Sequence, residues 1–386
     1  MAASNPSRPE RPSGHSIEAS AGLRTHVSRR LPDIPFTPEE WNQLAEGSST
    51  TTVFQTYEWF EGWWNSFGQD GQLLLISVFR DDALLGFAPL MRRPSFLSFV
   101  ADTHSDYLDF ITGDNGPLVL REVLRHLIHH ERSWSELHLR NIPASSPTVA
   151  LLESFSVNED LLLLRGTDMP CFLLQVDGSE EDVRQRVSKY SLRRASNYFS
   201  RQGHLTVRTV DSVSEGQQLL PVFFDQHIRR WSTTGTPSLF HETQNRHFYS
   251  ELITQLLPRG WLHLSVAELD EQPIAFHFGF DHAGTITWYK PSFDPDHAAH
   301  SPGKLILSHL MNCALDSNRS KLDFTIGAEP FKERYCDTQR VNTQYRVFRS
   351  RIGYFNALTR DHAYRSIRWI VRRLRLAPWL HHWRHE

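Results

Sequence analysis

The sequence is poor in the features that mark several common protein classes. It has only three cysteines in 386 residues, Cys171, Cys313 and Cys336, and their number and spacing form neither a disulfide framework nor a zinc pattern. A reducing cytoplasm is therefore the expected compartment. No apolar run approaches the length of a membrane span, and the N-terminus lacks the apolar core of a signal peptide.

Several motifs that would identify a function are also missing. The net charge of −3 gives no global attraction to nucleic acid or membrane. The glycine patterns of a P-loop or a dinucleotide fingerprint do not occur, and no Gly-x-Ser-x-Gly elbow indicates a serine hydrolase. Histidine is plentiful, but the group at 126, 129 and 130 and the group at 381, 382 and 385 lack a His-Glu-x-x-His pattern. We therefore expect no metal site.

What remains is a globular α/β chain that is long enough for two domains or one duplicated unit. Residues 1–33 are rich in Ser, Pro and Arg without an apolar period, which predicts a disordered leader. Strand and helix patterns then alternate in an N-terminal half over 34–165 and a C-terminal half over 166–353. The hairpin pattern of 73–90 recurs at 262–279, which is compatible with duplication, although any two hairpins share such alternation.

The most informative stretch is 289–335. A strand over 285–289 and a polar loop precede a helix, for which Ser301 is the expected N-cap and Pro302 the first helical residue. A helix N-terminus attracts anions, Gly303 lets a ligand approach the backbone, and Lys304 adds charge. On spacing alone, an ordinary capped helix is the favoured interpretation.

A second strand, 321–326, follows that helix and ends at Gly327. Asp323 lies among its apolar residues, where a buried carboxylate needs a partner. Glu329 lies in the next loop, and partial burial there would suit a general base. Lys332 could stabilise charge. The alternative is a structural set of salt bridges around a turn, and the sequence does not decide between them.

The runs SPGKLIL and DFTIGAEPFKERY resemble the C-terminal half of the GNAT-type acyltransferases associated with cellulose and exopolysaccharide synthesis, a family related to the Fem-type aminoacyl transferases. The resemblance covers roughly 36–350. It implies two tandem GNAT-like halves, each a mixed, largely antiparallel sheet flanked by helices. The donor it implies is acyl-CoA, with acetyl-CoA favoured. This loop has fewer glycines than the standard one, which leaves the acyl carrier open.

The resemblance also implies roles for individual residues. The acyl group would pass to a primary amine on an amino sugar, an amino acid or a polysaccharide precursor. The implied residues are, for catalysis, Glu329, Asp323, Lys332 and Tyr335; for the donor pyrophosphate, Ser301, Pro302, Gly303, Lys304 and Leu305; and for the acceptor, Asp106, Tyr107, Asp109, Tyr289 and Arg193. An aminoacyl-tRNA-dependent transferase and a non-catalytic binding protein are the alternatives.

The C-terminal segment 354–386 is basic. Apolar residues at 367, 370, 371 and 374 alternate with arginines, which predicts an amphipathic helix. We favour packing on the core with the arginines solvated. Contact with tRNA or with the surface of the inner membrane is the alternative. The sequence does not indicate an oligomeric state.

Overall fold

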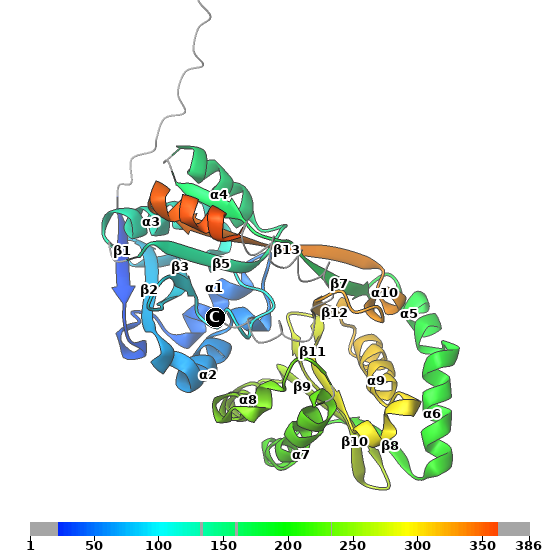
Figure 1. Cartoon of the computed structure of the whole chain (residues 1–386). Helices are drawn as coiled ribbons and strands as arrows, with labels where there is room; N and C mark the ends of the chain where they lie inside the picture. Colours follow the sequence, from blue (N-terminus) through cyan, green and yellow to red (C-terminus); the bar gives the residue numbers. More distant parts are fainter. Residues whose placement is uncertain (1–21, 132–133, 159–160, 233, 362–386) are drawn as a thin grey trace, which may run out of the picture.

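The computed structural model describes residues 22–131, 134–158, 161–232 and 234–361. These residues form one large mixed sheet flanked by helices (Figure 1). The N-terminal part contributes β1 (Leu23–Ser28), α1 (Pro38–Glu46), α2 (Tyr57–Phe67), β2 (Gln72–Arg80), β3 (Ala83–Arg92), β4 (Leu97–Phe99), α3 (Gly116–His129), β5 (Glu136–Pro143), α4 (Pro147–Asn158) and β6 (Leu162–Arg165).

The C-terminal part contributes β7 (Met169–Gln175), α5 (Glu180–Val187), α6 (Tyr190–Gln202), β8 (Leu205–Thr209), α7 (Val213–Trp231), α8 (Thr243–Leu256), β9 (Leu262–Leu269), β10 (Gln272–His282), β11 (Thr285–Phe293), α9 (Gly303–Asp316), β12 (Lys321–Ile326), α10 (Lys332–Tyr335) and β13 (Thr338–Phe348). Helices α6 and α9 lie on one side of its sheet, and α7 and α8 on the other (Figure 1). Among the described residues, no helix is long and apolar enough to cross a membrane.

The strand order shows that the two halves have the same arrangement. From one edge it reads β1-β2-β3-β4-β5-β13, and from the other edge β8-β9-β10-β11-β12-β7. Each half contains one parallel pair, β4 with β5 and β11 with β12. The turns of the equivalent hairpins each use an aspartate with positive φ, Asp81 at 53° and Asp270 at 48°. The predicted fold of two tandem GNAT-like halves is therefore confirmed.

Strand β13 joins the halves. It comes last in the chain, but it pairs antiparallel with β5 and β6 of the N-terminal part as well as with β7 (Figure 1). The C-terminal half thus supplies a strand to the sheet of the N-terminal half. Helix α2 also bridges the halves, because the buried Trp59 ring packs on Phe248 of α8 and on Tyr289 of β11. Other aromatic residues of α2, Phe60, Trp63 and Phe67, belong to the same core.

The described part of the chain begins with a strand and ends with a helix. The predicted leader is wrong for its last part, because β1 pairs with β2 from Leu23 opposite Arg80 to Ser28 opposite Leu75. An edge strand is held by backbone hydrogen bonds to a single neighbour. Its side chains therefore need not alternate between apolar and polar, and the sequence showed no such pattern here. At the other end, residues 351–361 are helical. Residues 1–21 and the amphipathic segment 364–376 lie outside the described residues, so the interpretations of both remain predictions.

Candidate active site

The parallel strands β11 and β12 separate within the C-terminal half. They pair only from Thr285 opposite Lys321 to Thr287 opposite Asp323. Beyond that point β11 continues beside β10, while β12 reaches Ile326 beside β7. The carboxyl ends of parallel strands are where open sheets commonly bind ligands. Helix α9 connects these two strands, so its start belongs to the same end of the sheet.

A bulge in β11 lies at this separation. The register passes from Thr287 opposite Phe280 to Lys290 opposite Phe278, so two β11 residues face Gly279 alone. The Tyr289 N–H donates to Nε2 of His277 at 3.2 Å. Burial lowers the pKa of His277 well below its ordinary value, which keeps the ring neutral and able to accept. A Cβ at position 279 would lie 2.1 Å from the His277 ring, so only glycine fits there.

Asp323 has its buried partner in the other half of the protein. The Tyr107 hydroxyl donates to Asp323 Oδ1 at 2.8 Å, and the Thr325 N–H donates to the same oxygen at 2.7 Å. Burial raises the pKa of Asp323, while these hydrogen bonds oppose the rise. The sequence predicted that this buried carboxylate needs a partner. That partner is Tyr107, another predicted site residue, which lies more than two hundred residues away in the chain.

Asp106 lies beside a lysine that sequence reasoning did not assign. Its half-buried carboxyl has a pKa raised by burial, and the positive charge of Lys290 opposes that rise. Burial lowers the pKa of Lys290, and its ammonium lies 4.2 Å from the centroid of the Tyr289 ring. The sequence could have pointed to Lys290, because the chain has only five lysines and this one directly follows the predicted strand over 285–289. The Tyr289 hydroxyl donates to the His104 carbonyl at 2.5 Å, so it links the halves.

Glu329 and Lys332 form an ion pair after β12. The Lys332 side chain is only 2% exposed, and its ammonium donates to Glu329 Oε2 and to the Ile326 carbonyl, each at 2.8 Å. The Glu329 side chain is 55% exposed, so the expectation of partial burial is wrong. Position 327 has a φ of 119°, which suits its glycine and lets the loop turn back to cover the ammonium.

Three other predicted residues make no hydrogen bond or ion pair with Asp323 in the described part of the chain. Tyr335 is buried, and its hydroxyl lies 3.1 Å from Ser191 Oγ of α6. Arg193 is exposed on α6. Asp109 is 4% exposed. Its carboxylate accepts from Thr50 at 3.2 Å, Ser146 at 2.5 Å, Thr148 at 2.6 Å and the Phe110 N–H at 2.9 Å. With four donors, Asp109 holds the frame of the site and is not free to contact an acceptor.

The start of α9 differs from the capped helix that was predicted. Ser301 has a left-handed φ of 57°, and Pro302 is the N-cap without a side-chain hydrogen bond. The short 3-10 helix η6 (Pro295–His300) ends in that left-handed residue, which turns the Ser301 side chain out of the capping position. A Cβ on Gly303 would meet only Phe293, at 4.0 Å. The backbone there is open to approach, and pyrophosphate binding by residues 301–305, Lys304 and Leu305 included, stays a prediction.

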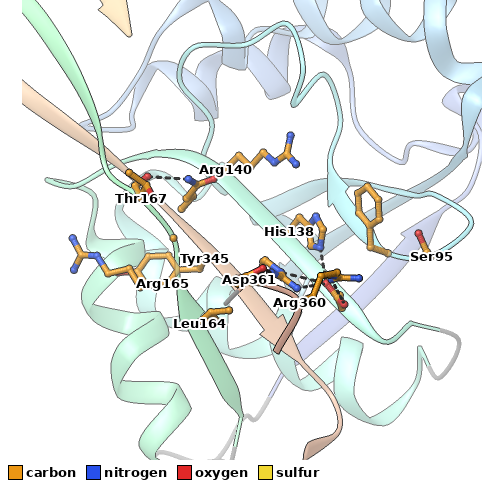
Figure 2. Close-up of a pocket in the computed structure, with 14 residues that line it drawn as sticks. Ser95, His138, Arg140, Leu164, Arg165, Thr167, Tyr345, Arg360 and Asp361 are labelled. Carbon is orange, nitrogen blue, oxygen red and sulfur yellow. Dashed lines mark hydrogen bonds and ion pairs between the residues drawn. The ribbon is translucent and has the colours of Figure 1, made fainter. Parts of the chain in front are cut away.

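A cavity of about 420 Å³ lies between the halves, and both Tyr107 and Asp323 line it. A second cavity, of about 540 Å³, lies between β5, β13 and the end of β6 (Figure 2). None of the predicted site residues lines the second one. Figure 2 shows His138, Arg360 and Asp361 as one group, in which Glu136 binds His138 at 2.9 Å and Arg360 at 3.4 Å. We therefore place the candidate active site at the cavity between the halves.

Comparison with known proteins concerns the C-terminal half and the overall fold. Residues 186–333 match the family model of the GNAT acetyltransferase domain. The matched range includes the separating strands, the start of α9 and Asp323, so the C-terminal half carries a GNAT-type domain. No curated protein matches the sequence significantly. Within the described residues, no group of three or more His, Cys, Asp or Glu side chains could hold a metal ion.

Two solved structures are similar in fold over most of the chain. FemX has a TM-score of 0.60 at 10% identity, with 81% of this chain and 96% of that chain covered. L-PGS from Bacillus licheniformis has a TM-score of 0.51 at 13% identity, with 82% of this chain and 92% of that chain covered. These likenesses concern the fold.

Proposed function

We propose that the protein is an N-acyltransferase that passes an acyl group from acyl-CoA, with acetyl-CoA favoured, to a primary amine. The observation that carries the proposal is the position of Asp323. This carboxylate lies where the parallel strands of the GNAT-type domain separate. It accepts a hydrogen bond from Tyr107 of the other half and lines the cavity between the halves. A donor at the separated strands and an acceptor in the cavity would meet at this residue.

The donor would bind by its pyrophosphate at the start of α9. Gly303 leaves the backbone accessible there, Lys304 supplies a positive charge, and the helix N-terminus favours anions. The acyl end would extend toward the bulge at Tyr289, where a buried neutral imidazole fixes the backbone.

In the transfer, the neutral amine attacks the thioester carbonyl. A carbon–nitrogen bond forms, the carbon–sulfur bond breaks, and the surplus proton of the amine passes to Asp323. The sulfur leaves as a thiolate and takes up a proton from water, and Asp323 returns its proton to water, so the step ends with the thiol of CoA and the carboxylate restored. Burial suits Asp323 to this role because a raised pKa brings a carboxylate closer to the proton affinity that a base needs near neutrality. Asp106 is the second carboxylate; it does not line the cavity, and we assign it to orienting the incoming ammonium before the amine reaches Asp323.

We extend the same proposal to the origin of the acceptor and to the location of the protein in the cell. The resemblance to the cellulose and exopolysaccharide acyltransferases supports an acceptor from polysaccharide metabolism. The three widely spaced cysteines support a cytoplasmic location, and the basic segment 354–386 is the candidate contact for the inner membrane. An aminoacyl-tRNA donor is the second candidate, favoured by the fold likeness to FemX.

A thermal-shift series on the full chain tests the proposal, since a ligand that binds only the folded state raises its melting temperature. Acetyl-CoA, longer acyl-CoAs and aminoacyl-tRNA are compared, and thiol release is measured with a panel of amines. A shift with acyl-CoA together with amine-dependent thiol release supports the acyltransferase. A shift with aminoacyl-tRNA alone supports the second candidate. A shift with acyl-CoA and no thiol release with any amine would indicate a binding protein.

A further inference from the structure

Charged and polar side chains line the cavity between the two halves. The cavity volume of about 420 Å³ lies within the range of roughly 300–1,000 Å³ that is usual for small-molecule sites. The Thr51 hydroxyl and Nδ1 of His282 are both buried, and neither has a hydrogen-bond partner among the described residues. His282 is 6% exposed, and burial lowers its pKa to about 4, so its ring is neutral near pH 7. Because both atoms are closed off from solvent, a ligand in the cavity would be recognised by the charged and hydroxyl side chains that face it.

The cavity also carries both signs of charge. Lys321 and Asp323 are two residues apart on β12, so their side chains are on the same face of the sheet, and both line the cavity. The third charged group is Arg340 on β13, whose guanidinium lies 4.0 Å from Asp323 Oδ2 and whose side chain is 43% exposed. Lys321 makes no ion pair within 4 Å anywhere in the described part of the chain. The site therefore offers one carboxylate and two cations.

The uncharged part of the wall combines apolar side chains with several hydroxyl and amide groups. Besides Thr51, the wall includes Ser49, Thr50, Ser145, Thr285, Thr287 and Asn342. A purely apolar ligand would displace water from hydroxyls such as those of Ser49 and Ser145 without replacing its hydrogen bonds, and a simple ammonium ligand would face two cations beside one carboxylate. The complementary molecule has an ammonium group, an anionic group and hydroxyls.

We propose that this cavity binds the acceptor, and that the acceptor is a hydroxylated primary amine that carries an anionic group. The amine lies at Asp323, and the anion lies at Lys321 and Arg340. A phosphorylated amino sugar and a hydroxylated amino acid share this chemistry. The name "acceptor" rests on the proposed acyl transfer, in which the amine nitrogen forms the amide bond as the thioester carbon–sulfur bond breaks. The binding itself does not rest on that transfer.

Titration calorimetry of the full chain without acyl-CoA tests the binding with four probes. Glucosamine 6-phosphate and serine carry all three groups, glucosamine lacks the anion, and glucose 6-phosphate lacks the amine. We expect one of the first two to bind at least about tenfold more tightly than glucosamine and glucose 6-phosphate, because each single-feature probe leaves a charged group of the site unpaired. Which of the two binds identifies the source of the shared chemistry.

Matched variants locate the groups. Lys321→Met should lower the affinity for the tighter of the two full probes about tenfold and leave glucosamine unchanged, whereas Asp323→Asn should lower that affinity and leave glucose 6-phosphate unchanged. Arg201→Met, an exposed cation on α6 outside the cavity, is the control. The proposal is overturned if neither full probe binds more tightly than the single-feature probes, or if Lys321→Met weakens glucosamine equally.

The two proposals fail separately. Tight binding of a full probe without thiol release from any acyl-CoA would refute the acyl transfer and leave the cavity assignment standing. Acyl transfer to an amine whose KM is unaffected by Lys321→Met would refute the cavity assignment and leave the acyl transfer standing.

Discussion

Asp323→Asn and Glu329→Gln form the most informative pair of variants, because either carboxylate could be the base. In the first variant the asparagine amide keeps the shape of the side chain, and its oxygen can still accept from Tyr107 and Thr325. Two charge-assisted hydrogen bonds, each worth about 1.5–3 kcal/mol, become neutral ones worth about 1 kcal/mol. Relief of the buried charge offsets part of that loss. We therefore expect the unfolding free energy to change by no more than about 2 kcal/mol.

Turnover should respond more strongly than stability. Loss of a general base lowers kcat roughly 10²–10⁴-fold, which corresponds to about 3–5 kcal/mol of transition-state stabilisation. Glu329→Gln should leave kcat within about threefold of the parent, because the Glu329 carboxylate is mostly exposed and already paired with Lys332. The glutamine amide oxygen in this variant can still accept from that ammonium, so we expect a small loss of stability.

Three measurements on both variants decide the question: steady-state thiol release, acyl-CoA affinity and thermal melting. Acyl-CoA affinity should be unchanged in both, since neither residue belongs to the proposed pyrophosphate site. A folded Asp323→Asn variant with normal turnover, beside an inactive Glu329→Gln variant, would refute the reasoning and exchange the roles of the two carboxylates.

Three further predictions test the donor site, the bulge and the ion-pair network. Gly303→Glu should abolish acyl-CoA binding and leave the melting temperature unchanged, because the added side chain meets open space but brings negative charge to the pyrophosphate position; unchanged CoA affinity would remove this assignment. His277→Phe should lower kcat more than it changes the KM for acyl-CoA, since the Tyr289 N–H at the bulge loses its acceptor. If binding away from the bulge is lost to the same extent as kcat, the variant has unfolded and the bulge has no specific role. Hydrogen bonding from His138 first, and the nearby arginines, lower the pKa of Glu136 from its ordinary 4.5 to about 2, so its contribution is present above pH 4.5 and lost as the pH falls toward 2. Chemical denaturation of Glu136→Gln should show about 2–3 kcal/mol less stability than the parent at pH 7 and a difference that shrinks below pH 4.5; a constant difference would contradict the linkage.

The sequence by itself determined the elements and much of the plan. Alternating apolar runs around the acidic turns at Asp81 and Asp270 predicted the two hairpins that occupy equivalent places in the sheet. An aspartate within the apolar strand 321–326 predicted a buried carboxylate with a partner, and that partner exists. These features are local, because periodicity, turn chemistry and the cost of an unpaired buried charge act within a few residues.

Only the tertiary structure decided which residues meet. Tyr107 and Asp323 are brought together by the pairing of two halves, and no local pattern specifies a contact across that distance in the chain. The same holds for Asp109, which the family resemblance implied as an acceptor contact, but whose carboxylate accepts hydrogen bonds from Thr50, Ser146 and Thr148 instead. The exposure of the Glu329 side chain argues against its role as a partly buried base, and the left-handed turn at Ser301 determines how α9 begins. Each of these outcomes depends on surroundings that distant segments supply, which is why the sequence indicated the chemistry of the site but not its geometry.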